Sequence, residues 1–282
     1  MDLQGRSMLL KVLATVLVWG NLWGAERIIA LSPAINETLY ALGAGDQIVA
    51  NTEYCNYPPE AKNKPKVGGY FSPSLEKILS LSPTMVILQE NNAPLAVKIQ
   101  KMGIKTRTIK IDTYPSIRRS IFTIGAVVHK EKRAEAIVSE LDQKLRALRG
   151  IIRNQKILMV FGHNTDLSKS IYVSGQNLYF DDLIRESGNT NALQSRRKGQ
   201  PVLNLENIIA LNPDIIILLA PNTKERGLTK EALIAPWRSL PINAVREGKM
   251  YVEDQPYSSN PSQRLGLFLD DMRGYLIDAA RR

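Results

Sequence analysis

The chain has 282 residues, of which 44% are hydrophobic and 23% charged, and a formal net charge of +10 at pH 7. This composition is typical of a globular protein and excludes wholesale disorder, a collagen-like repeat and a small disulfide-stapled domain. The single cysteine, Cys55, excludes a cysteine-rich zinc or iron–sulfur site, and two histidines are too few for a three-histidine metal site.

Residues 1–25 have the pattern of a secretory signal peptide. Two basic residues precede an apolar run at residues 12–20, and residues 21–25 after it end in small residues. Either Met1 or Met8 is the start. A membrane anchor is the alternative interpretation, but the apolar run is shorter than the roughly 20 residues that a span needs. We therefore expect an exported protein whose mature chain begins near Glu26.

The rest of the chain alternates between short β patterns and helical patterns, which indicates an α/β fold, and its length favours two lobes over one core. In the first part we expect strands at residues 27–31, 47–52, 85–88 and 106–111, and helices at 36–42, 75–81 and 94–102. In the last part we expect strands at 156–161, 215–219 and 250–253, and helices at 180–186, 205–210 and 265–280.

Between these two groups the pattern is helical only. It breaks near His129, and the second helical stretch, residues 130–149, would extend for about 30 Å. We therefore expect two Rossmann-like α/β lobes, residues 26–113 and 155–282, with a ligand cleft between them. Residues 114–154 would form a helical linker whose single long α-helix bridges the lobes.

The two lobes contain a repeated segment. Residues 74–87 align without a gap on residues 204–217, and each copy has an N-cap residue, a Leu-Glu pair, a short helix, a proline and a β-branched strand. Glu76 and Glu206 occupy the same position in the two copies. In that position each would at least complement the dipole of its helix.

Ligands of open α/β sheets bind beyond the carboxyl ends of the strands. This rule selects the loops at residues 32–33, 53–57, 89–92, 162–166, 220–222 and 254–257, which are rich in Tyr and carboxamides. His163 is the one histidine in these loops. It could form a hydrogen bond within the protein, or it could contact a ligand or a metal. The sequence contains no phosphate-binding loop, nucleophile elbow or His-Glu-x-x-His motif.

The basic residues are dispersed along the chain, and no zinc-finger or RNA-binding motif accompanies them. We therefore expect no binding of nucleic acid. An anionic ligand or a negatively charged membrane surface fits the charge better.

Several short motifs follow one another along the chain. They are RIIALSPA at 27–34, LGAGD at 42–46, YPPEA at 57–61, SLEKI at 74–78, GNTN at 188–191, LNPD at 211–214 and GKMYV at 248–252. In this order and spacing they resemble the cobalamin- and iron-chelate-binding periplasmic proteins of ABC importers. The resemblance implies two α/β lobes bridged by one long helix, and a metal chelate carried in the cleft to an inner-membrane permease. Tyr70 and Phe71 stand where the cobalamin binder carries Trp, which leaves the chelate open.

The resemblance also implies site residues. Aromatic faces stack on a macrocycle or a catechol, and arginines pair with anionic groups. We expect ligand contacts from Tyr54, Tyr57, Tyr70, Phe71, His163, Arg196, Arg197, Tyr257 and Arg264, although the basic run at Arg196 is equally compatible with a solvated loop. Glu76 and Glu206 match the paired glutamates, one on each lobe, that meet arginines of the permease.

We therefore expect a monomeric periplasmic solute-binding protein that delivers a ferric siderophore, a heme-type iron complex or a corrinoid to an ABC importer. It would have no intrinsic cofactor, no direct metal ligand other than a possible His163, and no enzymatic activity. An exported enzyme acting on a corrinoid or metal complex is one alternative, for which only His163 with Asp166 offers an acid–base pair. A ligand sensor without a transport role is the other.

Overall fold

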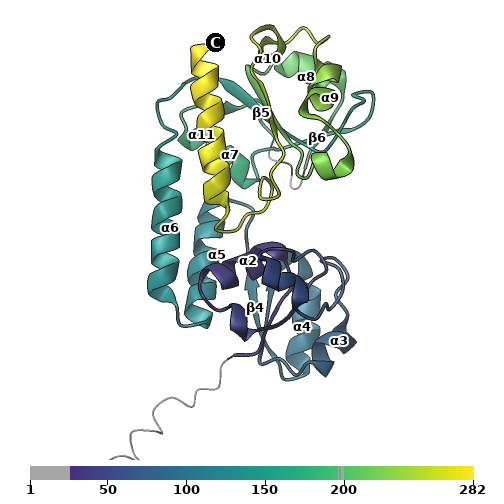
Figure 1. Ribbon diagram of the computed structural model, residues 1–282, viewed down its shortest axis with the longest axis vertical. Coiled ribbons are helices and arrows are strands. Elements are labelled where there is room, and N and C mark those ends of the chain that lie inside the picture. Colours follow the sequence, from purple (N-terminus) through teal and green to yellow (C-terminus); the bar gives the residue numbers. More distant parts are fainter. Residues whose placement is uncertain (1–25, 196, 198–199) are drawn as a thin grey trace, which may run out of the picture.

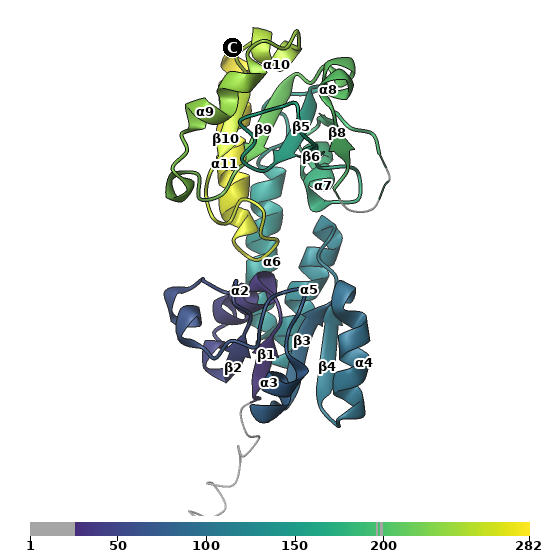
Figure 2. The same cartoon turned by 90° about the vertical axis from the view of Figure 1, so that its right-hand side faces the viewer.

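Two α/β lobes are stacked along the long axis of the molecule, with long helices running beside them (Figures 1 and 2). The computed structural model describes residues 26–195, 197 and 200–282. The expected signal peptide at residues 1–25 lies outside this part of the chain. None of the helices within it is long and apolar enough to cross a membrane.

The N-terminal lobe is built on a parallel sheet in which the strands have the order β2-β1-β3-β4. The strands are β1 (Ile28–Ala30), β2 (Ile48–Asn51), β3 (Met85–Gln89) and β4 (Lys105–Ile109). The helices are α2 (Pro33–Ala41), α3 (Leu75–Ser80) and α4 (Ala93–Lys101). All of these elements occur where the hydrophobic pattern predicted them, with shifts of a few residues at their ends.

The start of α2 is earlier than predicted. We expected Ser32 and Pro33 only to end the first strand, with a helix from residue 36. Instead, the Ser32 Oγ accepts a hydrogen bond from the Ile35 amide (3.3 Å) and Pro33 is the first helical residue. Because proline has no N–H to leave unpaired in the first turn, Ser-Pro is a favourable helix start. The helix therefore begins at the carboxyl end of β1, where it faces the other lobe.

The C-terminal lobe has the sheet order β10-β9-β5-β6-β8, and β7 pairs with the first two residues of β5. Its parallel centre consists of β5 (Lys156–Phe161), β9 (Ile215–Leu219) and β10 (Met250–Glu253), with the predicted bounds. Helices α7 (Tyr179–Glu186) and α8 (Leu205–Leu211) were also predicted. Strands β5 and β9 are buried on both faces of the sheet. Strands of this kind are continuous apolar runs, which is why the sequence pattern predicted them.

Several short elements of this lobe were not predicted. They are β6 (Ile171–Val173), β7 (Thr190–Asn191), β8 (Val202–Leu203), α9 (Lys230–Ile234) and α10 (Asn243–Arg246). The strands β6 and β8 are antiparallel to their neighbours. Strands of two or three residues are too short to show an alternating pattern.

The linker between the lobes is a helical hairpin of α5 (Tyr114–Val127) and α6 (Glu131–Arg146). The break at His129 was predicted, and this residue has a positive φ of 55° between the two helices. The bridging helix α6 runs from the level of the N-terminal lobe to that of the C-terminal lobe, beside the C-terminal helix α11 (Leu265–Arg281) (Figure 1).

A single buried apolar cluster connects both lobes through these helices. It includes Ile28 of β1, Ile121 of α5, Leu141 of α6, Phe180 of α7 and Phe268 of α11. Since a rearrangement of the lobes would have to repack this common core, the relative position of the lobes is fixed by packing as well as by the bridging helix.

The two helices of the hairpin approach each other closely at a glycine of α5. A Cβ added at Gly125 of α5 would lie 2.6 Å from the Ala134 Cβ of α6. We predict that Gly125→Ala lowers the free energy of unfolding by about 1–2 kcal/mol, because overpacking outweighs the better helix propensity of alanine. Denaturant unfolding measures the change.

The matched control is Gly274→Ala in α11, where an added Cβ would meet nothing within 4 Å. At this exposed position only helix propensity acts, and the free energy of unfolding should rise by about 0.5–1 kcal/mol. Equal effects of the two substitutions would contradict the close approach of α5 and α6.

Candidate functional site

Three adjoining cavities lie between the lobes, at the carboxyl ends of the strands of both sheets. The first has a volume of about 700 Å³ and includes five aromatic residues in its walls, and we call it the aromatic compartment. The second, of about 710 Å³, is lined mainly by polar side chains, and we call it the polar compartment. A passage of about 280 Å³ shares Phe71 with the first and Tyr54 with the second. Together they form one interlobe cleft in the place that the sheet topology predicted.

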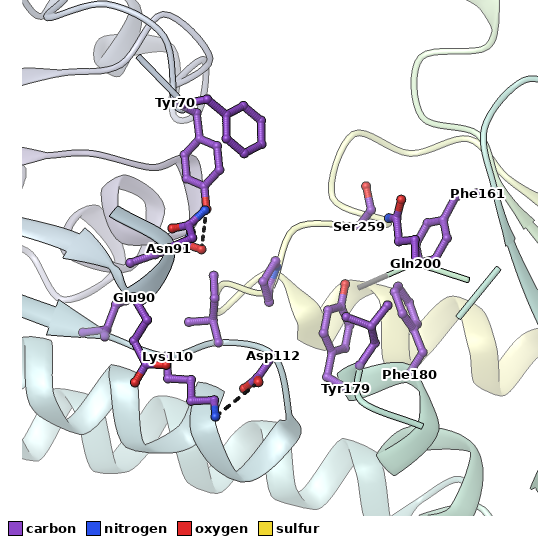
Figure 3. A pocket seen from close by; sticks show the side chains of 16 residues that line it. Tyr70, Glu90, Asn91, Lys110, Asp112, Phe161, Tyr179, Phe180, Gln200 and Ser259 are labelled. Atoms are coloured by element: carbon purple, nitrogen blue, oxygen red, sulfur yellow. Dashed lines mark hydrogen bonds and ion pairs between the residues drawn. The ribbon is translucent and has the colours of Figure 1, made fainter. Parts of the chain in front are cut away.

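Aromatic side chains of the two lobes form opposite walls of the aromatic compartment (Figure 3). On the N-terminal wall, the Tyr70 and Phe71 rings meet edge to face with centroids 4.6 Å apart. On the C-terminal wall, Phe180 stacks on Tyr179 at 4.2 Å and meets Phe161 edge to face at 5.6 Å. The Phe71 side chain is 83% exposed, so its face is available to a ligand. Such walls suit a flat, partly apolar ligand.

Polar groups hold the N-terminal wall in place. The Tyr70 hydroxyl donates to Gln89 Oε1 and accepts from the Asn91 amide, each at 2.7 Å. Burial raises the pKa of Tyr70, partly offset by the hydrogen bond from Asn91, so the phenol is neutral at physiological pH. At the base of the compartment, Lys110 and Asp112 form an ion pair at 3.4 Å (Figure 3).

The polar compartment combines hydroxyl, carboxamide and charged groups from both lobes. Its lining residues include Tyr54, Asn56, Tyr57, Lys62, Asn222, Glu225, Ser259 and Asn260. Tyr54 is 62% exposed and Tyr57 is 43% exposed. This lining offers donors and acceptors to a hydrophilic group and, through the tyrosine rings, faces for stacking.

A buried ion pair joins the lobes at the edge of the polar compartment. Arg264 Nη1 lies 3.1 Å from Glu37 Oε1, and the Ser262 hydroxyl donates to Glu37 Oε2 at 2.6 Å. The Arg264 guanidinium lies 3.9 Å from the centroid of the Tyr57 ring and 5.2 Å from that of Tyr257, both within cation–π range. Burial raises the pKa of Glu37, and the contacts with Ser262 and Arg264 oppose this rise.

The pairing of Arg264 changes its expected role. We expected this arginine to pair with an anionic group of the ligand, but its charge is already matched by Glu37, whose side chain is only 6% exposed. Arg264 lines the polar compartment, so it is near a ligand there. Its main observed contact, however, is between the lobes. The sequence could not indicate this pair, because the two residues are 227 positions apart.

The remaining predicted ligand residues lie in different places. His163 hydrogen-bonds through Nε2 with the Pro221 carbonyl (2.9 Å), and the Tyr257 hydroxyl donates to Asp271 at 2.7 Å. Neither is among the residues that line the three cavities. Arg197 is exposed, and Arg196 lies outside the described residues. Direct ligand contacts of these four residues stay predictions.

Sequence reasoning missed the C-terminal aromatic wall. Tyr179 and Phe180 are the first residues of α7, which follows an irregular segment rather than a predicted strand. The rule that selects loops after strands therefore passed over them. Their aromatic side chains beside a helix start were the only available signal.

Metal-ligating side chains do not gather in the described part of the chain. Among those residues, no group of three or more His, Cys, Asp or Glu side chains is arranged to hold a metal ion. What the cleft offers is aromatic faces, carboxamides and a few charges.

Comparisons with known proteins relate most of the chain to one family. The family model described as "Periplasmic binding protein" matches residues 28–257. The vitamin B12-binding protein of Vibrio cholerae is 24% identical over 242 residues, which is 85% of each chain. An uncharacterized ABC transporter substrate-binding lipoprotein of Bacillus subtilis is 26% identical over 249 residues, covering 85% of this chain and 76% of the relative. The apo structure of the periplasmic heme-binding protein RhuT from Roseiflexus sp. RS-1 superposes with a TM-score of 0.74 at 25% identity, covering 91% of this chain and 100% of that one.

The buried ion pair yields a prediction for stability. In Arg264→Met, Glu37 would remain buried without its counter-charge, and we predict that the free energy of unfolding falls by about 3–5 kcal/mol. In the double variant Glu37→Gln with Arg264→Met the uncompensated charge is gone, so most of this loss should be recovered. Denaturant unfolding of the two single variants and the double variant gives the cycle. A double variant no more stable than Arg264→Met would show that the charge pair is not the reason for the loss.

Proposed function

The chain belongs to the periplasmic binding protein family, and on that premise we propose that it is a periplasmic solute-binding protein that carries a metal chelate to an ABC importer. The chelate would be a corrinoid, a heme-type iron complex or a ferric siderophore. The relatives named for vitamin B12 and heme support the first two. Export by residues 1–25 is part of this proposal.

The observation that carries the proposal is the pair of facing aromatic walls in the cleft. Phe71 and Tyr70 on one side and the largely buried Tyr179 and Phe180 on the other are among the residues that line a cavity of about 700 Å³. This volume is within the range of roughly 300–1,000 Å³ that is usual for small-molecule sites. The polar compartment adds room for hydrophilic substituents of a large chelate.

The chemistry of the cleft favours a chelate over a bare ion. A free divalent cation needs several carboxylate, imidazole or thiolate ligands at short distance. The described residues offer no such group of three. A chelate brings its own metal ligands and needs stacking surfaces and hydrogen bonds instead, which this cleft has.

Binding rather than catalysis is the proposed activity. The alternative enzyme would need an acid–base pair in the cleft. The candidates His163 and Asp166 hydrogen-bond with the Pro221 carbonyl and the Ser168 amide, respectively, rather than with one another. The relatives are named as binding proteins, which supports the same conclusion.

Docking to the permease would use the repeated segments of the two lobes. Ser74 and Asn204 cap α3 and α8 as the repeat predicted, which puts Glu76 and Glu206 in equivalent first turns. Both side chains are exposed. In Figure 1, α3 and α8 lie on the same side of the molecule, away from α6 and α11. A flat partner surface with two basic sites could therefore meet both glutamates at once.

We predict that the purified protein binds cyanocobalamin or hemin, and that Phe71→Ala weakens this binding by about 1–2 kcal/mol through loss of stacking. Absorbance titration measures both. Because Phe71 is 83% exposed, its removal should leave the stability unchanged. The control is Phe122→Ala, which removes another exposed phenylalanine (42%), on α5. Tight binding of free zinc or manganese, with neither chelate bound, would overturn the proposed function.

The docking role gives a second prediction. Glu76→Lys with Glu206→Lys should abolish ligand uptake by cells, because like charges would then face the permease arginines. Ligand affinity of the purified variant should not change, since neither residue lines the cleft. Glu131→Lys with Glu135→Lys introduces the same charge on exposed positions of α6 and should leave uptake intact. Normal uptake by the first variant would count against the docking role.

A further inference from the structure

The loop that follows β2 brings four side chains to the polar compartment. They are Tyr54, Asn56, Tyr57 and Lys62, and we call residues 52–63 the cleft loop. Its base is closed by two backbone hydrogen bonds, from the Asn51 amide to the Pro65 carbonyl and from the Val67 amide to the Asn51 carbonyl, both 3.0 Å long. The loop is therefore anchored at its ends, and its interior needs a separate means of support.

A lysine ammonium lies inside this loop. Lys66 Nζ is 2.7 Å from Asn51 Oδ1, 2.9 Å from the Ala61 carbonyl and 3.3 Å from the Cys55 carbonyl. An ammonium has three donors, so these three acceptors account for all of them. Cys55 belongs to the outgoing arm of the loop and Ala61 to the returning arm. Lys66 thus connects the two arms to each other and to the end of β2.

The network continues to the backbone of a tyrosine in the cleft wall. The Asn51 amide nitrogen donates to Asn36 Oδ1 (2.9 Å) and to the Ala61 carbonyl (3.0 Å). The Asn36 amide nitrogen in turn donates to the Tyr57 carbonyl at 2.9 Å. Both asparagines are completely buried. Buried polar groups in such a chain hold a specific geometry, because any displacement leaves one of them unpaired.

The surroundings of Lys66 indicate what its charge does. The three oxygens around the ammonium belong to carbonyl and carboxamide groups, and burial lowers the pKa of Lys66. The side chain is not among those that line the three compartments of the cleft. Its position suits the fixing of backbone carbonyls beneath the cleft rather than contact with a ligand.

We propose that Lys66 is a positioning residue for ligand recognition, which fixes the cleft loop so that Tyr54 and Tyr57 are held ready in the wall of the polar compartment. The proposal rests on the cleft being the ligand site, as proposed above. Its physical content is preorganisation: a loop that is already ordered in the free protein does not have to be ordered when the ligand binds. Since Arg264 packs on the Tyr57 ring, the same lysine also supports the contact between the lobes.

The first test is the variant Lys66→Met, which keeps most of the length of the side chain and removes the ammonium. We expect binding of cyanocobalamin or hemin to weaken about tenfold, because the cleft loop must then be ordered on binding. In the ligand-free variant, hydrogen exchange of amides 53–63 should become faster, whereas β9 and α6 keep their protection. Bound ligand should restore protection of the loop. A residue that only adds global stability would not produce this local change.

The matched control is Lys64→Met, which removes the same charge two residues away. The described residues give the Lys64 side chain no hydrogen bond or ion pair, so affinity and exchange should stay as in the unmodified protein. If Lys66→Met does not fold, Lys66→Gln is the second variant. It keeps a polar group at this position but has no charge and only two amide donors for the three oxygens that the ammonium contacts, and it should raise exchange in the same loop and weaken binding.

Two outcomes would overturn the proposal. One is unchanged exchange of amides 53–63 in Lys66→Met, or in Lys66→Gln if the first variant does not fold. The other is faster exchange of the loop with undiminished affinity. If the unmodified protein binds neither chelate, a corrinoid and a heme-type complex are excluded as its ligand, and the ligand-free exchange experiment alone still decides whether Lys66 holds the loop.

Discussion

The buried pair of Glu37 and Arg264 is the contact on which the geometry of the cleft depends. It joins the first turns of α2 to the residue just before α11, and so connects the N-terminal lobe to the C-terminal lobe at the base of the space between them. A buried ion pair adds little net stability, because desolvation of the two charges offsets their attraction. Its effect lies in specificity: other arrangements of the lobes would leave one of these charges buried alone. The pair therefore favours the observed separation of the two cleft walls.

Apolar packing, like this ion pair, holds the two lobes in one relative position. The apolar cluster that includes β1, α5, α6, α7 and α11 is shared by both lobes, so the lobes cannot rotate without disturbing side chains in low-energy positions. The aromatic wall formed by Tyr179 and Phe180 begins α7, and Phe180 also packs on Phe268 of α11 at 5.5 Å. One ring thus belongs both to the cleft and to the core. This arrangement favours a preformed cleft, which suits a large rigid ligand that gains affinity from complementary walls.

Sequence patterns predicted the parts of this molecule that depend on local periodicity. The buried strand Ile215–Leu219, the bridging helix and the paired segments of α3 and α8 all follow from patterns within a few residues, and the structure confirmed them. Features that depend on distant pairing could not be predicted. The antiparallel strands β6 and β8 are defined by their partners rather than by their own two or three residues. The partner of Arg264 and the network around Lys66 likewise exist only once the chain has folded, because hydrogen-bond partners separated by many residues leave no periodic pattern.

Helix α2 carries both the residue that pairs with Arg264 and a residue of the hydrogen-bond network around Lys66. Its start is set by the Ser32 cap and Pro33, and the next turn presents two consecutive buried polar residues. Asn36 binds the Tyr57 carbonyl, and Glu37 binds Arg264, whose guanidinium packs on the ring of the same tyrosine. The backbone of Tyr57 is thus held from within its own lobe, and its ring is held from the other lobe. Because Asn36 and Glu37 are adjacent on one short helix, a shift of α2 would disturb both contacts together. The position of the cleft loop and the separation of the lobes are therefore not independent: both follow from where a Ser-Pro helix start places the first turns of α2 at the carboxyl end of β1.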